Sequence, residues 1–348
     1  MKILVLGGTG TISRYIVSSL ASQGHELILL NHHEKDTHGL PNVRVELCDR
    51  KDYPAFISKC REIGPFDCVY DMITFTPEDA NSSVEAFANN AKQVVFCSTV
   101  DVYTKLADRY PVKEDGERNA LTSFPYAYRK KICEDIYMEA DKKGLFHTTI
   151  IRPAHTYSEG SPKSHLLFNV FETAPGPSYL LDRIKKGKPI IVHGDGMSVW
   201  GSTHGSDMAS AFVGALGNEK AFGKAYTAAG NESWSYRKYY EVVAEVMGVP
   251  KINFVFIPMD LLLKLEPEKA HLCGENFMYN NIFDTTAART ELGMTSNVSW
   301  REGVKRCLDY FDAHGGLNNS DNEEYAFYDR IIEKYTSMCE KLVNEYVK

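Results

Sequence analysis

The chain has 348 residues, and its 39 Lys and Arg against 46 Asp and Glu give a formal net charge of -7 at pH 7. This length leaves ample room for a buried core in one large domain or two smaller ones. The acidic balance disfavours general binding to phosphate backbones, so no nucleic-acid partner is expected.

Eight cysteines are spread along the chain without the spacing of a zinc or redox motif. We therefore expect buried or free thiols in a reducing compartment, and no metal site. The first residues, MKILVLGG, run directly into a short apolar stretch, and no long apolar span follows. This pattern predicts a cytoplasmic protein without a membrane segment.

In the first half, short apolar runs alternate with helical patterns. Residues 11–24 predict a helix with one apolar face, and Gly24 suits its end. Strands are predicted around it and further along, at residues 2–7, 25–31, 66–72, 93–99 and 146–153.

The second half is less regular. Residues 161–178 carry Pro and Gly and predict a loop-rich excursion. Residues 322–348 predict a surface helix packed on the body, with an oligomer seam as the alternative. Between them we expect strands at 188–196, 224–231 and 253–258, and helices at 206–217 and 235–248.

Strands that alternate with helices imply parallel pairing with both sheet faces covered. The predicted fold is therefore α/β, a Rossmann-type doubly wound parallel sheet with a smaller, interleaved C-terminal α/β lobe. The dinucleotide-binding domain is expected over residues 1–155, with 205–230 returning to it. The substrate lobe is expected over 156–204 and 231–315, and the helical tail over 316–348.

The stretch VLGGTGTIS places Gly7, Gly10 and Ser13 in a GxxGxx(small) pattern between a strand and a helix. Such a turn brings a pyrophosphate onto backbone N–H groups at the helix N-terminus, here around Thr11 and Ile12. The third position controls helix packing on the strand, and Ser is small enough for it. The pattern predicts a dinucleotide site.

The second strand ends at Asn31, followed by His32 and His33. An acidic residue at this position favours NAD, and a basic one favours the 2'-phosphate of NADP. Asn31 is neutral, and His32 could partly neutralise a phosphate. The cofactor is therefore NAD or NADP, and two surface histidines without a cofactor role are an equal alternative.

Tyr126 and Lys130 are four residues apart and project from one helical face. A tyrosine titrates near pH 10, and a nearby ammonium and oxidised nicotinamide lower its pKa so that it can exchange a hydroxyl proton. Upstream, an apolar strand ends at Ser98 and Thr99, whose hydroxyls can bind the same substrate oxygen. A chance Tyr-xxx-Lys match and simple strand-end capping are the alternatives.

Together the segments GGTGTIS, CDRKD, CSTVDVY, the Tyr-xxx-Lys helix, IIRPAHTY and HGDG…THGSDMASAF resemble the extended short-chain dehydrogenases/reductases of the NAD(P)-dependent epimerase/dehydratase type. The segment FDCVYDMITFTPEDANSSVEAF is similar to the atypical branch that includes the chloroplast stem-loop-binding proteins. Some members of that branch bind RNA.

The resemblance implies a role for each matching residue. Thr99 would polarise the substrate oxygen, Tyr126 would be the acid/base, and Lys130 would bind the nicotinamide ribose and tune Tyr126. Further cofactor contacts are implied at Asp49, which would face the adenine, and at Ser98 and Pro153. The resemblance also implies a homodimer through two helices that flank the sheet, one of them carrying Tyr126.

One departure concerns the substrate. Nucleotide-sugar members usually follow the GDG turn with an Arg, whereas the matching residue here is Trp200, which cannot replace a guanidinium. Trp200 would stack on a sugar or pack inside the lobe. His155, Arg183 and His204 are further candidates for substrate contacts; a solvated helix charge is the alternative for Arg183, and a structural hydrogen bond for His204.

These observations predict an NAD(P)-dependent oxidoreductase or epimerase that acts on a carbinol of a sugar-like substrate, including nucleotide sugars. The alternative is a non-catalytic NAD(P)-bound protein that binds RNA or senses redox state. Retention of Thr99, Tyr126 and Lys130 favours the enzyme, because a sensor does not need a phenolate.

Overall fold

The computed structural model describes residues 1–33, 39–160, 166–167, 169–171, 178–317, 321 and 323–347. It divides into two compact units. Unit 1 comprises residues 1–157, 201–231 and 282–298, and unit 2 comprises the described parts of 158–200, 232–281 and 299–348. Most of the predicted excursion at 161–178 lies outside the described residues.

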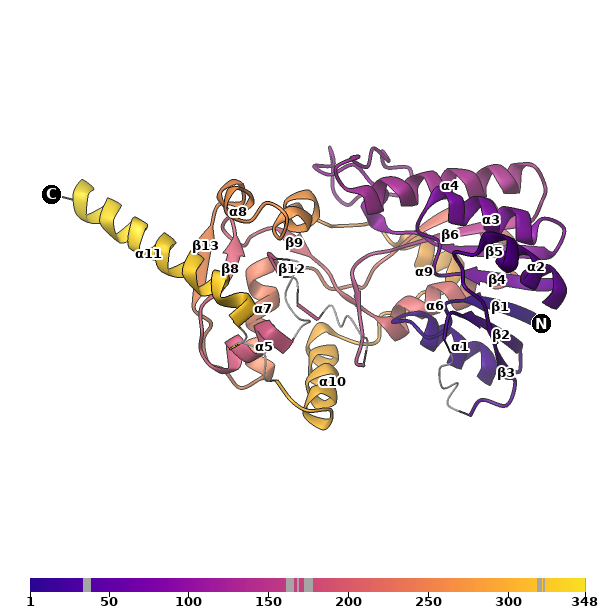
Figure 1. The fold of residues 1–348 in the computed structure, drawn as a ribbon, viewed down its shortest axis with the longest axis horizontal. Coiled ribbons are helices and arrows are strands. Elements are labelled where there is room, and N and C mark those ends of the chain that lie inside the picture. The colour runs from indigo at the N-terminus through magenta and orange to yellow at the C-terminus, as the bar shows by residue number, and fades with distance from the viewer. Residues whose placement is uncertain are drawn as a thin grey trace. The chain divides into compact units, whose positions relative to one another are not determined.

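Unit 1 is built on a seven-stranded sheet whose pairings are all parallel (Figure 1). The strand order is β11-β6-β5-β4-β1-β2-β3. The bounds are β1 Lys2–Leu6, β2 Glu26–Asn31, β3 Val43–Leu47, β4 Phe66–Asp71, β5 Ala91–Cys97, β6 His147–Pro153 and β11 Lys224–Ala228. The predicted Rossmann-type α/β fold is confirmed.

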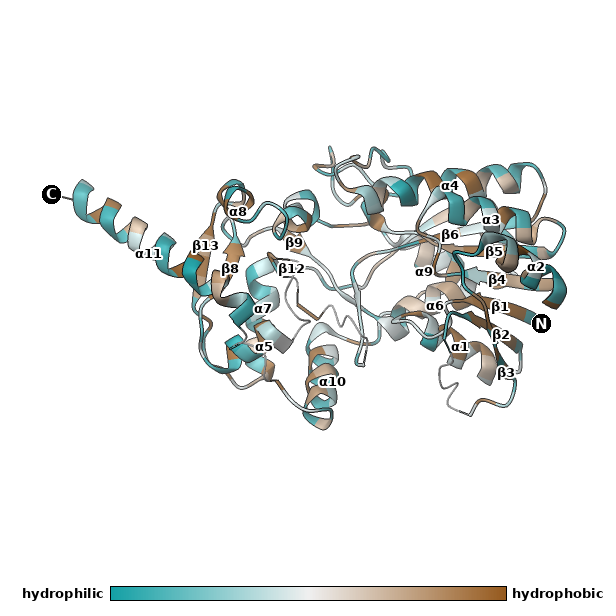
Figure 2. Cartoon of the chain, viewed as in Figure 1, coloured by the Kyte–Doolittle hydropathy of each residue, from teal (hydrophilic) through white to brown (hydrophobic). Residues whose placement is uncertain are grey.

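Helices cover both faces of this sheet because its apolar side chains alternate. Ile3 and Val5 pack with one set of helices and Leu4 and Leu6 with the other. The first set is α1 (Ser13–Ser22), α6 (Gly205–Ala215) and α9 (Thr286–Leu292); the second is α2 (Tyr53–Ile63), α3 (Pro77–Phe87) and α4 (Pro125–Lys142). In Figure 2 the strands at the centre of unit 1 are largely brown, as expected for a doubly covered sheet.

The sequence wrongly assigned residues 282–298 to the substrate lobe. Helix α9 packs in the core of unit 1 through Ala288 and Leu292, and Phe283 forms an isolated β-bridge with Val112. The short strands β7 (Thr156–Tyr157) and β10 (Thr203–His204) also pair with each other within unit 1. These contacts are long-range, so local patterns could not reveal them.

Unit 2 contains two small sheets, with β8 parallel to β13 and β9 antiparallel to β12. Its strands are β8 Ile190–His193, β9 Val199–Trp200, β12 Trp234–Ser235 and β13 Phe254–Ile257. Its helices are α5 Ser178–Lys185, α7 Tyr236–Val246, α8 Met259–Leu265, α10 Trp300–Ala313 and α11 Ala326–Tyr346.

The predicted tail helix forms as α11, but only its first turns are packed. Phe327, Tyr328 and Ile331 are buried, whereas Leu342 and Tyr346 are exposed. None of the helices in the described part of the chain has the length and apolar character needed to cross a bilayer.

Candidate active site

The glycine turn joins β1 to α1 at the carboxyl edge of the sheet. Gly7 has φ +78°, and a Cβ at this residue would lie 2.4 Å from Cγ2 of Ile73. A Cβ at Gly8 would lie 2.7 Å from Cδ2 of Leu29. The turn therefore requires glycine both for its left-handed backbone and for close packing.

Ser13 fixes the turn through its hydroxyl, a role that we did not predict. Its Oγ accepts a hydrogen bond from the Gly10 N–H at 2.8 Å and donates to the Gly7 carbonyl at 2.6 Å. A Cβ at Gly205, the first residue of α6, would lie 2.4 Å from the Thr11 carbonyl, so α6 begins directly against the turn. These contacts hold the turn in one conformation.

Gly7→Ala tests the turn. We expect weaker dinucleotide binding and lower stability, since Ile73 must move in addition to the strain of a left-handed alanine. Gly24→Ala is the matched control, because Gly24 has φ +82° and no atom lies within 4 Å of the added Cβ. This substitution should therefore cost only the backbone strain of about 1–2 kcal/mol. Equal effects of the two changes on binding, measured by fluorescence titration with NADH, would contradict the assignment.

At the end of β2, the Asn31 side chain is buried and turned toward the glycine turn. Its Oδ1 accepts from the Gly8 N–H at 3.2 Å, and its Nδ2 is buried without a hydrogen-bond partner. His32 is exposed, with its Nδ1 3.0 Å from Nε2 of His33. Asp49 follows β3 and is exposed. The Asn31 side-chain amide therefore offers an unpaired N–H donor beside the glycine turn. The side chains of His32 and Asp49 are accessible to a ligand.

Thr99 and Tyr126 lie together after the end of β5 and at the start of α4. The Thr99 hydroxyl lies near enough to the Tyr126 hydroxyl to influence its pKa. Burial raises the pKa of the Tyr126 hydroxyl well above its usual value, the Asp101 carboxylate raises it further, and the neighbouring Thr99 hydroxyl opposes the shift. The side chain still has 39% of its surface exposed, so a substrate can reach it.

Lys130 lies one helical turn after Tyr126, as the spacing predicts. Its Nζ donates to the Cys97 carbonyl at 2.7 Å and lies 6.0 Å from the centroid of the Tyr126 ring. Burial lowers the pKa of Lys130. We expected Lys130 to help lower the pKa of Tyr126, but with the protein's own groups the net shift is upward because burial dominates.

The β4–α3 loop links the glycine turn to this pair. Ile73 packs on Gly7, and the Phe75 ring lies 6.5 Å from that of Tyr126 and 4.7 Å from Lys130 Nζ. Phe75 was not among the predicted site residues. The loop places the turn and the Tyr–Lys pair at the same edge of the sheet.

A dinucleotide fits the groups gathered at this edge. The Ser98 Oγ is buried without a hydrogen-bond partner, as is Asn31 Nδ2, and such buried groups normally have partners. Pro153 is buried at the end of β6. The narrow glycine turn supplies backbone N–H groups at the start of α1, where negative charge is favoured. These residues would hold the cofactor.

The two candidate histidines differ in accessibility. His155 is partly exposed after β6, and its Nδ1 lies 2.7 Å from Ser202 Oγ. His204 is only 1% exposed, caps α6 by accepting from the Ser206 N–H, and packs between the rings of Tyr15 and Tyr157. His155 remains a candidate for substrate contact, whereas His204 has the structural role that was its alternative.

The structure does not support substrate contacts for Arg183 and Trp200. Both lie in unit 2. Arg183 is fully buried, pairs with Asp329 at 2.6 Å and packs on the Tyr328 ring, so it joins α5 to α11. Trp200 is 2% exposed, and its indole N–H donates to backbone carbonyls of Phe277 and Tyr279. The sequence suggested both as ligand contacts because of their residue types. Their burial could not be predicted, because it depends on residues far away in the chain.

The helix that carries Tyr126 and Lys130 is anchored by a third residue on the same face, Glu134. Its carboxylate accepts two hydrogen bonds from the Arg152 guanidinium on β6, both at 2.8 Å. Tyr126, Lys130 and Glu134 follow one another at intervals of four residues, so the helical spacing could have indicated Glu134. The spacing could not have indicated its partner on β6. This ion pair fixes α4 against the sheet.

Comparisons with known proteins agree with this architecture. The chain is 26% identical over 267 residues to the chloroplast stem-loop binding protein of 41 kDa b of Arabidopsis thaliana, covering 73% of this chain and 65% of that protein. It is 20% identical over 335 residues to a UDP-N-acetyl-alpha-D-glucosaminuronate decarboxylase of Bacillus cytotoxicus, covering 89% and 97%.

Among solved structures, the UDP-glucose 4-epimerase of Thermotoga maritima superposes with a TM-score of 0.71 at 19% identity, over 90% of this chain and 99% of that one. This similarity supports the fold. The family model for NAD dependent epimerases/dehydratases matches residues 3–229. The chain therefore belongs to the NAD-dependent epimerase/dehydratase family.

Proposed function

We propose that this protein is an NAD(P)-dependent oxidoreductase or epimerase that acts on a carbinol of a sugar or sugar-derived substrate, including nucleotide sugars. The observation that carries the proposal is the placement of Tyr126 near the Thr99 hydroxyl and 6.0 Å from Lys130 Nζ, at the same sheet edge as the glycine turn. Family membership supports the cofactor class and the reaction type.

The nicotinamide, when bound, supplies a hydride acceptor or donor. The protein's own groups do the rest. The N–H groups of the glycine turn would hold the pyrophosphate, and Lys130 would bind the nicotinamide ribose. Tyr126 exchanges a proton with the substrate oxygen, and Thr99 hydrogen-bonds that oxygen. The raised pKa of Tyr126 favours its protonated form, which is the form that donates a proton when a carbonyl is reduced.

The names of two relatives support a sugar as the substrate. One acts on a UDP-linked uronate, and a 2'-dehydrokanamycin reductase of Streptomyces kanamyceticus is 23% identical over 284 residues. The Arg that usually grips a nucleotide-sugar pyrophosphate is replaced by the buried Trp200. His155 is the polar group that we place at the substrate.

The proposal is tested on the protein as it is purified. Mass spectrometry of co-purifying small molecules should find a dinucleotide, and fluorescence titration with NADH and with NADPH decides between the two. Turnover is then followed by NADH absorbance on a panel of UDP-sugars and sugar ketones. Failure to bind either dinucleotide would overturn the proposal.

A second candidate is a cofactor-bound RNA-binding protein, because one relative carries the name of a stem-loop binding protein. The net charge of -7 opposes it. A gel-shift titration with a stem-loop RNA tests this candidate, since binding to the RNA backbone must weaken steeply as the salt concentration rises.

We also propose that the protein is cytoplasmic and forms a homodimer through α4 and a neighbouring helix that flanks the sheet. Light scattering tests the oligomeric state.

A further inference from the structure

The ammonium of Lys130 lies among three aromatic rings of unit 1. Its Nζ is 4.7 Å from the centroid of the Phe75 ring, 4.9 Å from that of Phe96 and 6.0 Å from that of Tyr126. The rings come from the β4–α3 loop, from β5 and from the start of α4. Distances up to about 6 Å are those of cation–π contacts. Phe75, Phe96 and Tyr126 therefore form an aromatic cage around the ammonium, the Lys130 cage.

The charge of Lys130 has few other partners. The side chain is 1% exposed, and its Nζ donates to the Cys97 carbonyl at 2.7 Å. Within the part of the chain that the structure describes, no carboxylate forms an ion pair with Lys130. An ammonium that is buried without a counter-ion is unfavourable, and it has two further N–H donors. The faces of the rings therefore take the place of water around this ammonium.

Phe75 is the ring of the cage that can be changed without disturbing the core or the proposed acid/base. Phe96 is fully buried, whereas Phe75 is 44% exposed. The backbone of Phe75 is nevertheless fixed, because its N–H and that of Thr76 donate to Asp79 Oδ2 at 3.0 and 3.1 Å. The Asp79 carboxylate also accepts from Lys51 Nζ, at 2.7 and 2.9 Å. These bonds hold the Phe75 ring next to Lys130.

Resting on the proposed function, we propose that Phe75 is a positioning residue, whose ring stabilises the charged form of Lys130 and keeps the ammonium beside Tyr126. Lys130 would bind the ribose through the N–H donors that the Cys97 carbonyl leaves free. A neutral amine could not stabilise a Tyr126 phenolate by its charge. The exposed ring of Phe75 thus maintains the form of Lys130 that the reaction requires.

The ring acts on Lys130 together with burial and charge. Burial lowers the pKa of Lys130, and the cation–π contact opposes this shift because it favours the ammonium. The titratable groups that face Lys130 from the packed elements are Asp71 on β4, Cys97 on β5, and Tyr126, Cys133 and Glu134 on α4. A change confined to the Phe75 ring leaves all of these groups in place, so the titration of Lys130 reports the contribution of the ring.

Fluorination tests the contact while the ring keeps nearly the same shape. Each fluorine withdraws electrons from the face of the ring and weakens its attraction for a cation. Phe75 alone is replaced by phenylalanine with one, two and three ring fluorines, and NMR follows the Cε resonance of labelled Lys130, assigned from the Lys130→Arg variant. We expect the midpoint of the Lys130 titration to fall stepwise with each fluorine, by about one pH unit in total.

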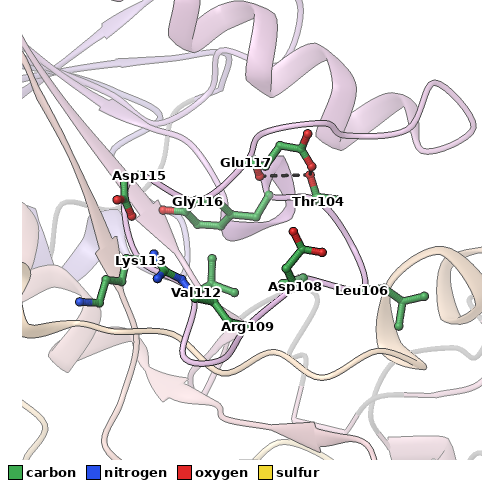
Figure 3. Close-up of a pocket in the computed structure, with 11 residues that line it drawn as sticks. Thr104, Leu106, Asp108, Arg109, Val112, Lys113, Asp115, Gly116 and Glu117 are labelled. Atoms are coloured by element: carbon green, nitrogen blue, oxygen red, sulfur yellow. Dashed lines mark hydrogen bonds between the residues drawn. The ribbon is translucent and has the colours of Figure 1, made fainter.

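Two controls separate this contact from general effects. Tyr128→trifluorophenylalanine places the same ring on α4, at a position that is 38% exposed and outside the Lys130 cage. Leu106→Ala removes an exposed apolar side chain from a cavity of about 190 Å³ in the segment 103–117 (Figure 3), whose lining includes no residue of the cage. Both variants should leave the midpoint of Lys130 unchanged.

The proposal is overturned if the midpoint of Lys130 stays constant or rises as fluorines are added at position 75, or if either control lowers it equally. Because the titration uses the protein alone, it is independent of turnover. An inactive enzyme or absent dinucleotide binding would defeat the proposed function and leave the titration result standing.

Discussion

Replacing Tyr126 by Phe is expected to reduce turnover by about 10²-fold or more, the scale of general acid–base catalysis. The ring remains and packs as before against Phe75, 6.5 Å away, and only the hydroxyl is lost. Dinucleotide affinity should stay nearly unchanged, since the glycine turn and Lys130 are untouched. Turnover is measured by NADH absorbance on the best substrate of the panel, and affinity by fluorescence titration.

Tyr128→Phe provides the matched control on the same helix. Tyr128 has 38% of its surface exposed, close to the value for Tyr126, and it projects from another part of the helix. It should retain the parent turnover. A Tyr126→Phe variant as active as Tyr128→Phe would remove Tyr126 from the mechanism, whatever the cofactor affinity.

Replacing Glu134 by Ala is expected to lower the free energy of unfolding by about 3–5 kcal/mol, the usual cost of leaving a buried charge without its partner. Arg152 is buried and would lose both of its 2.8 Å bonds to the carboxylate. Urea unfolding followed by circular dichroism measures the change.

Asp135→Ala is the control for this change. Asp135 is the next residue on α4, is half exposed, and pairs with Arg118, which also contacts Glu134. An exposed pair of this kind contributes at most about 1 kcal/mol. If both variants lost equal stability, the Glu134–Arg152 pair would not be the anchor of α4.

Much of the fold could be predicted from the sequence because it rests on local periodicity. The alternation of Ile3 and Val5 with Leu4 and Leu6 already implies a strand covered on both faces. Gly7, Gly10 and Ser13 mark the turn, and the four-residue spacing of Tyr126 and Lys130 places both on one helical face. These are short-range relations, which a local pattern can carry.

Other parts of the site depended on residues far apart in the chain. Burial of Arg183 requires Asp329 and Tyr328 from the last helix, and burial of Trp200 requires the backbone of residues 277–279. Residue type suggested ligand contacts for both, because Arg and Trp are common in binding sites. Whether such a side chain meets a ligand or a protein partner is decided only by the folded chain.

The sequence by itself determined the parallel sheet, the glycine turn and the Tyr–Lys helix, because each is set by spacing within one or two elements. The tertiary structure alone decided that Tyr126 lies near Thr99, that Phe75 lies beside Tyr126 and Lys130, and that Glu134 meets Arg152. The physical reason is that hydrogen bonds and burial depend on distances in space. For residues far apart in the chain, these distances are set only when the strands and helices have packed together.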